Sequence, residues 1–243
     1  DLTYNRAIPD SERVYLMTLP SFGAGETKQQ SFLARPVAEM GLADNPYVET
    51  YGVAALDDVN KVNVIVGEGT EAKTHSVTFA QMTSGALKTF GIQAVMGSFE
   101  EIGEGGYVAI SETAAVRLGV AVDSVLQLES WGQTNYFVVR AIYKDLPVAS
   151  DLKNIEVIRC NQLETQNLTS TSNWSYNYYV KLRSTEDKAL CEEVISKKYA
   201  ELMAQELKRY RGMQHSDPSF YKQLDKLETF IDDIHCDLMP IRD

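Results

Sequence analysis

Apolar residues recur at helical spacing in the last quarter of the chain, within STEDKALCEEVISKKYAELMAQELKRYRG (184–212). The apolar stripe steps by four: Cys191, Ile195, Tyr199, Met203 and Leu207. Such a stripe is typical of an amphipathic helix that covers a core. Ser184 with Asp187 approximates a capping box, and Gly212 suits the C-terminal stop. The pattern predicts one long helix, a second near SFYKQLDKLETFI, and a final extended segment at CDLMPI.

The rest of the chain shows shorter, mostly strand-like patterns. RVYLMTL (13–19) predicts a strand, and Pro36 suits the first turn of a short helix, PVAEMGLA, which YVETYGVAAL follows as a strand. QMTSGALKTFGI looks helical, with Ser84 as its cap. The other predicted strands are VNVIV, HSVTFA, YVAI, VLQLES, YFVVRAIY and IEVIRC. The middle of the chain is therefore mostly β.

Composition and charge narrow the function. Apolar residues make up 44% of the 243 residues, and 23 basic against 34 acidic residues give a net charge of −11. This balance is that of a folded globular protein, and its negative field repels phosphate backbones, so we do not expect nucleic-acid binding. The sequence contains no apolar run of the roughly 20 residues that span a bilayer and no signal-peptide pattern at its start.

The cysteines do not form a recognisable site. Cys160, Cys191 and Cys236 are far apart, odd in number and without C-x-x-C spacing, so a structural zinc site is unsupported. One disulfide with one free thiol stays open, and the redox state of the three is not determined by the sequence.

Ser111 lies where YVAISETAAVRLG passes from strand to helix, as a nucleophilic serine often does. A nucleophile elbow needs G-x-S-x-G, but the flanking residues are Ala109 and Thr113. No motif links His75, His215 or His235 to this serine. We therefore predict a helix cap, with Gly119 as the helix stop, and no catalytic residues.

Two glycine-bearing stretches, SFGAGETK and VGEGTEAK, resemble fragments of phosphate-binding loops. Neither completes the G-x-x-x-x-G-K-[ST] or G-x-G-x-x-G pattern, so both are predicted to be turns, and no cofactor is expected. DDIHCD (232–237) concentrates potential metal ligands, but no second His or Cys pair completes a zinc set. We expect solvated acids at a helix end there, and no metal site.

An aromatic run, NWSYNYY (173–179), offers rings that could stack on sugars or bases. On a strand, Trp174, Tyr176 and Tyr178 would share one face and Tyr179 would lie on the other. We expect these rings to pack in a core or an interface.

Several stretches, in this order, resemble the segments between membrane helices of FtsX-like ABC transporter permeases. They are LTYNRAIPDSERVYLMT, PVAEMGLADNPYVETYGV, LKTFGIQAVMGSF, YVAISETAAVRLG, VVRAIYKDLPVASDL and LMPIRD. Together they cover almost the whole chain, although Leu118-Gly119 and SVLQL replace a Phe-Gly and Ile-Gly-Lys pattern frequent in the family. The sequence is thereby identified as similar to the MacB-like periplasmic core domain.

The resemblance implies an α+β fold of two lobes. A porter-like α/β sandwich lobe would comprise residues 1–85 and 171–243, since the long amphipathic helix needs a sheet to bury its stripe. An inserted, mainly β lobe would comprise residues 86–170. The chain would begin and end beside membrane helices, so Asp1 and Asp243 would lie close together, with LTYNR and LMPIRD side by side and directed away from the inserted lobe.

The resemblance further implies a non-enzymatic, periplasmic domain of an inner-membrane permease. It would transmit motion driven by a cytoplasmic ABC ATPase to a substrate or partner, within a dimer of permeases that can include a periplasmic adaptor or a lipoprotein. The alternative is an extracytoplasmic ligand-sensing or carbohydrate-binding domain. A cleft lined by Trp174 and Tyr176 would favour that alternative.

Overall fold

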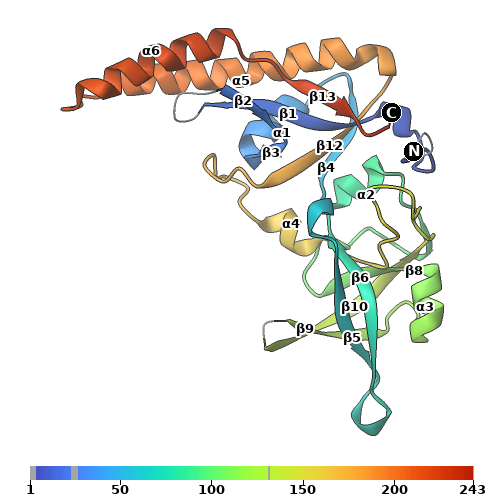
Figure 1. The fold of residues 1–243 in the computed structure, drawn as a ribbon. Helices are drawn as coiled ribbons and strands as arrows, with labels where there is room; N and C mark the ends of the chain where they lie inside the picture. The colour runs from blue at the N-terminus through green and yellow to red at the C-terminus, as the bar shows by residue number, and fades with distance from the viewer. Residues whose placement is uncertain (1–3, 23–26, 131, 243) are drawn as a thin grey trace. The chain divides into compact units, whose positions relative to one another are not determined.

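The structure is a computed structural model that describes residues 4–22, 27–130 and 132–242. The chain divides into two compact units, and the colour bar of Figure 1 locates the residues of each by number. The first, here the barrel unit, contains Asp1–Val14, Thr50–Gln166 and Ile241–Asp243. The second, here the open-sheet unit, contains Tyr15–Glu49 and Asn167–Pro240. The α+β fold with two units is as the sequence predicts.

The barrel unit is built on one curled sheet with the strand order β7-β10-β8-β11-β6-β5-β9. Because β9 also pairs with β10, six of these strands close into a ring and β7 lies outside it. The strands are β5 (Asn60–Val66), β6 (Lys73–Gln81), β7 (Ala94–Gly97), β8 (Tyr107–Ser111), β9 (Val125–Ser130), β10 (Gln133–Tyr143) and β11 (Val157–Arg159). A sheet closed in this way leaves few unpaired edges.

Inward-facing side chains of the ring form the core of the barrel unit. Val64, Phe137 and Val139 are buried there, and α3 (Glu112–Leu118) adds Ala114 and Leu118. The shorter helices of this unit are α2 (Ser84–Thr89) and α4 (Asn161–Thr165), with 3-10 turns η2 (Leu56–Asp58) and η3 (Gly69–Glu71). The predicted strands of the middle of the chain are thus all present.

Two glycines allow a close backbone approach in the barrel unit. A Cβ on Gly52 would lie 2.1 Å from the Ala86 nitrogen, and one on Gly85 would lie 2.2 Å from the Tyr51 carbonyl oxygen. Any side chain at either position would therefore force the backbone apart. The start of α2 sits directly against the chain at residues 51–52.

The open-sheet unit is built on strands in the order β13-β1-β12-β3. β1 pairs along its first half with β13, from Tyr15 opposite Pro240 to Thr18 opposite Asp237, and along its second half with β2. The strands are β1 (Val14–Phe22), β2 (Thr27–Gln30), β3 (Phe32–Leu33), β12 (Tyr176–Leu182) and β13 (Asp237–Pro240). β4 (Val48–Val53) pairs with β12, and only its first two residues, Val48 and Glu49, belong to this unit. Every residue of β12 is buried, because both faces of this strand are covered.

Three helices complete the open-sheet unit: α1 (Arg35–Leu42), α5 (Lys188–Arg211) and α6 (Pro218–Asp232). α1 approaches α5 closely at Gly41, whose added Cβ would lie 3.0 Å from Ile195. α5 and α6 run side by side as a hairpin, and Tyr210 meets Phe220 edge to face at 6.3 Å. Figure 1 shows this pair as the two longest helices.

The predicted helix ends are close to the observed ones. Ser184 accepts a hydrogen bond from the Glu186 nitrogen at 3.3 Å and opens the 3-10 turn η4 (Thr185–Asp187), after which α5 runs to Arg211 and Gly212 follows it. The prediction for α2 is wrong by one residue. Thr83, and not Ser84, is its cap, and its hydroxyl accepts from the Ala86 nitrogen at 3.3 Å.

The observed division of the chain differs from the predicted bounds of 1–85 with 171–243 and of 86–170. Residues 50–85 belong to the barrel unit, because β5 pairs with β9 and β6 pairs with β11. The segments Asp1–Val14 and Ile241–Asp243 also belong to it. Strand alternation predicts that β5 and β6 are strands, but it carries no information about which sheet they join.

Candidate functional site

Ser111 is a helix cap. Its side chain is buried, and its Oγ accepts a hydrogen bond from the Ala114 nitrogen at 3.4 Å. Asp145 adds a second cap, accepting from the Thr113 nitrogen at 3.0 Å and from the Thr113 hydroxyl. Gly119 ends the helix in the left-handed conformation, with φ of 66°. The hydroxyl of Ser111 is therefore committed to α3, as the sequence predicts.

The glycine stretch VGEGTEAK is a turn. It joins β5 to β6 and contains η3, with Gly67 and Gly69 at positive φ. In SFGAGETK, residues 23–26 lie outside the described residues, and the flanking residues end β1 and begin β2. No phosphate-binding loop followed by a helix is formed by the described part of either stretch.

The DDIHCD segment spans the end of α6 and the start of β13. Its Cys236 is buried, and the Cys236 nitrogen donates to Ser196 Oγ at 2.7 Å, while His235 is exposed. Within residues 4–22, 27–130 and 132–242, no group of three or more His, Cys, Asp or Glu side chains is placed to hold a metal ion.

All three cysteines are free thiols and buried. Burial raises the pKa of Cys191 to about 12 and raises those of Cys160 and Cys236 as well. The disulfide that the sequence left open is not formed in this structure.

The aromatic run behaves in two ways. Tyr176, Tyr178 and Tyr179 are buried in β12, as expected for core packing. Trp174 precedes the strand, is only half-buried, and lines a groove with residues of α5 and α6. Tyr176 is buried and is not among the residues that line this groove, so Trp174 and Tyr176 do not share it.

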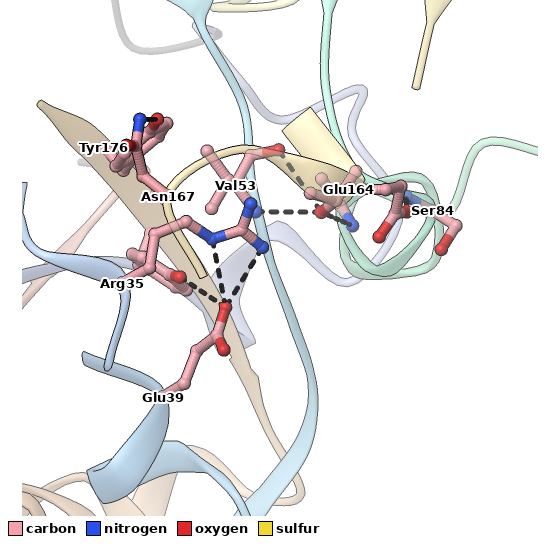
Figure 2. A network of polar contacts seen from close by, with 10 residues as sticks. Arg35, Glu39, Val53, Ser84, Glu164, Asn167 and Tyr176 are labelled. Carbon is pink, nitrogen blue, oxygen red and sulfur yellow. Dashed lines mark hydrogen bonds and ion pairs between the residues drawn. The ribbon is translucent and has the colours of Figure 1, made fainter. Parts of the chain in front are cut away.

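A polar network ties α1 to β12 within the open-sheet unit. The Arg35 guanidinium donates from Nη2 to Glu39 Oε1 at 3.1 Å, and the Tyr178 hydroxyl donates to the same oxygen at 2.6 Å. Figure 2 shows the Arg35–Glu39 pair and, nearby in the same unit, Asn167, whose amide donates to the Tyr176 hydroxyl at 2.6 Å. Because Arg35 is buried, this pairing satisfies a charge that would otherwise be costly to bury.

The two ends of the described chain meet in the barrel unit, at a cluster we call the terminal clasp: Asn5, Asp151 and Ile241. Asn5 Nδ2 donates to Asp151 Oδ2 at 2.8 Å and to the Ile241 carbonyl oxygen at 2.5 Å. The Asp151 nitrogen donates to Asn5 Oδ1 at 2.8 Å. Asn5 thus uses both ends of its amide while buried, in the left-handed conformation that asparagine tolerates.

Further contacts hold the same two segments together. The Ile241 nitrogen donates to the Val14 carbonyl oxygen at 3.2 Å, and Arg242 pairs with Glu12 at 3.5 Å. On the other side, the Asn5 nitrogen donates to the Ala149 carbonyl oxygen at 3.1 Å. The described parts of LTYNR and LMPIRD therefore lie side by side, as predicted, while Asp1 and Asp243 are outside the described residues.

The clasp also shows what the sequence analysis missed. We predicted that both end segments would point away from the lobe made by the middle of the chain, but they are joined to it through the 149–151 loop. LTYNR, KDLPVASDL and LMPIRD were all singled out as parts of the resemblance, so the contributing segments were recognised. Their convergence was not, because a long-range contact of one asparagine side chain leaves no periodic signal.

Over residues 4–22, 27–130 and 132–242, no helix combines the length and the apolar composition that crossing a membrane requires. No protein-family profile and no curated protein sequence matches the chain.

Solved structures do match it. A domain assigned to a permease protein from Porphyromonas gingivalis is similar with a TM-score of 0.63 and 18% identity, over 96% of this chain and 92% of that one. The periplasmic region of MacB from Actinobacillus actinomycetemcomitans follows with 0.51 and 11%, over 86% and 97%. The extracellular domain of the ABC-type transporter YknZ from Gram-positive bacteria gives 0.50 and 13%, over 79% and 95%. The chain therefore has the fold of the MacB-like periplasmic domains of ABC transporter permeases.

Proposed function

We propose that this chain is the extracytoplasmic part of an ABC transporter permease and that it works as a lever, without enzymatic activity of its own. A cytoplasmic ATPase would supply the energy, and movement of the membrane helices would be passed outward to a substrate or partner. The similarity to permease domains over most of their length supports the class of protein. In this proposal the permease forms a dimer and can work with a periplasmic adaptor or lipoprotein.

The terminal clasp is the observation that carries the lever proposal. A lever must receive movement at a defined point and must not fray there. Asn5 joins the N-terminal segment, the C-terminal segment and the 149–151 loop through its buried amide. In this proposal, displacement of either end segment reaches the rest of the barrel unit through the hydrogen bonds of the buried Asn5 side chain.

The chemistry of the chain supports a role without catalysis. The one serine at a strand-to-helix junction that resembled a nucleophile caps α3. The three thiols are buried with raised pKa values, which suppresses the thiolate that a nucleophilic cysteine needs. We expect the isolated chain to show no ATP binding in calorimetry.

The experiment that tests the lever uses the full-length permease with its ATPase, reconstituted in lipid. Spin labels are placed at Val116→Cys and Met213→Cys, which are exposed positions in the barrel unit and the open-sheet unit. The native cysteines are buried, so the protein without these substitutions measures background labelling. We expect the distance distribution to change between the nucleotide-free and vanadate-trapped states, and the isolated chain to show no change with ATP.

A clasp variant gives the matched comparison. Asn5→Ala removes the three clasp hydrogen bonds, whereas Asn135→Ala changes an exposed asparagine on β10. We expect the first variant to keep ATP hydrolysis but to lose most of the distance change, and the second to retain both. An unchanged distance distribution in the parent protein would contradict the lever proposal. A full distance change in Asn5→Ala would show that the terminal clasp is not needed for the movement.

A further inference from the structure

A groove opens in the open-sheet unit between the α5–α6 hairpin and the ends of β1 and β2. It has a volume of about 570 Å³, and every residue that lines it belongs to this unit. Its floor is formed by the buried side chains of Tyr199, Leu224 and Leu227. Half-buried Trp174, Met203 and Phe220 form its walls. A volume of this size is in the range of sites that hold a drug-sized molecule.

The apolar stripe of α5 explains where the groove lies. Tyr199 and Leu207 are buried, but Met203, which is four residues from each of them, stays only half-buried. The stripe that the sequence predicts thus continues through a position that is only partly covered. Methionine is flexible and polarisable, so it adapts to ligands of varied shape and contacts aromatic rings well.

The aromatic rings that line the groove meet at an angle and do not stack face to face with one another. Trp174 lies 6.3 Å from Tyr199 with an angle of 52° between the rings. Tyr210 and Phe220, at the other end, meet at 82°. Neither of these pairs is stacked face to face, but His215 stacks on one face of Phe220, at 4.4 Å and 15°. A planar ligand would therefore stack against the opposite face of Phe220.

The charges around the groove select against anions. Glu206 is the one Asp, Glu, Lys or Arg side chain among the described lining residues, and it already pairs with Arg209 at 2.5 Å. The other polar groups at the wall are uncharged, namely amides such as Gln30 and Gln223. Since the whole chain also carries a net charge of −11, an anionic ligand would be repelled without a compensating cation.

We propose that this groove binds a neutral, aromatic amphiphile of drug size. Its ring system would lie against Trp174, Met203 and Phe220, and its polar end would reach the amides of Gln30 and Gln223. The inference concerns one unit of the chain and does not depend on the lever proposal. Binding is tested on the isolated chain, so failure here leaves the transmission experiment unaffected.

The test uses N-phenyl-1-naphthylamine, a neutral aromatic probe whose fluorescence rises when it leaves water. The parent protein carries Trp131→Phe, so that Trp174 is its one tryptophan. We expect saturable binding of one probe per chain, with energy transfer from Trp174 to the probe. Met203→Glu should weaken the apparent affinity at least tenfold, because it brings a charge onto an apolar wall. Met213→Glu, at an exposed methionine outside the groove, is the matched control and should bind like the parent.

A second variant guards against loss of folding, which circular dichroism monitors in each protein. Gln223→Trp changes an exposed lining residue and fills part of the groove, so it should also lower probe binding at least tenfold, measured with direct excitation of the probe because this variant has a second tryptophan. Equal binding by the Met203 and Met213 variants would overturn the proposal. Equally tight binding of the anionic probe 1-anilinonaphthalene-8-sulfonate would also overturn it. A third contradicting outcome would be a dimer in sedimentation that Gln223→Trp dissociates, because a second copy of the chain would then fill the groove.

Discussion

The two units bury their apolar residues by different means. In the barrel unit the sheet closes on itself, so Phe137 and Val139 meet side chains from other strands of the same ring. In the open-sheet unit the sheet cannot close, and α1 and the α5–α6 hairpin must cover it. These helices do not cover the sheet completely, and a groove remains beside α5, where Met203 is one of the lining residues.

This difference predicts that the two units differ in their resistance to local opening. Closure of the ring satisfies backbone groups in every direction and favours a stiff body. An open sheet under helices keeps half-buried apolar side chains, which cost less to expose than fully buried ones. We therefore expect the barrel unit to resist local opening more than the open-sheet unit, and the following measurements test that difference in order of expected size.

Thiol labelling should show the largest effect. Cys160 belongs to the barrel unit, whereas Cys191 and Cys236 belong to the open-sheet unit, and burial raises the pKa of each. A raised pKa lowers the thiolate fraction at pH 8, and burial blocks access. All three should therefore react with Ellman's reagent roughly 10³-fold or more slowly than in urea-unfolded protein.

Peptide mapping of partly labelled protein then compares the units. We expect Cys191 and Cys236 to be modified before Cys160, because labelling requires local opening and the closed ring opens least. Labelling of Cys160 first would reverse the proposed order of stability.

A core truncation comes next in size. Phe137→Ala removes a ring from the closed core and should lower the free energy of unfolding by about 3–5 kcal/mol. Phe32→Ala, at an exposed phenylalanine on β3 of the open sheet, should lower it by less than about 1 kcal/mol. Urea unfolding followed by circular dichroism measures both. Equal losses of unfolding free energy in the two variants would mean that Phe32 stabilises the open sheet more than its exposure indicates.

The helix cap gives the smallest effect. Ser111→Ala removes the acceptor for the Ala114 nitrogen and should lower the free energy of unfolding by about 0.5–2 kcal/mol. Val116→Ala, on the exposed face of the same helix, should change it by no more than about 0.5 kcal/mol. A loss above about 4 kcal/mol for Ser111→Ala would show that the hydroxyl does more than cap α3.

Sequence reasoning succeeded where structure is local. The cap at Ser111, the stop at Gly119, Pro36 in the first turn of α1 and the length of α5 all depend on residues within a few positions of one another. Short polar strands such as β2, with the sequence TKQQ, lack an apolar face and were not predicted. They exist because β1 offers an unpaired edge beyond Thr18, where β13 stops.

Reasoning from the sequence failed where structure depends on distant partners. The division between the units was placed at residue 85, yet the pairing of β5 with β9 and of β6 with β11 decides that these strands belong to the barrel unit. The groove was missed for a related reason. Met203 has the spacing of a core residue, yet it is only half-buried, because helical spacing does not indicate how completely the neighbouring elements cover a position.

The antiparallel pairing of β1 with β13 has a mechanical consequence for the two chain ends. Tyr15 lies opposite Pro240, so the segment that precedes β1 and the segment that follows β13 lie at the same end of the ladder. Hydrogen bonds between antiparallel strands run perpendicular to the strands, so forces that separate the two ends would load them one at a time, as in unzipping. Forces that pull both ends in the same direction would leave this ladder unloaded. Splaying of the two end segments would therefore load the terminal clasp first and then the ladder, whereas their common displacement would load neither.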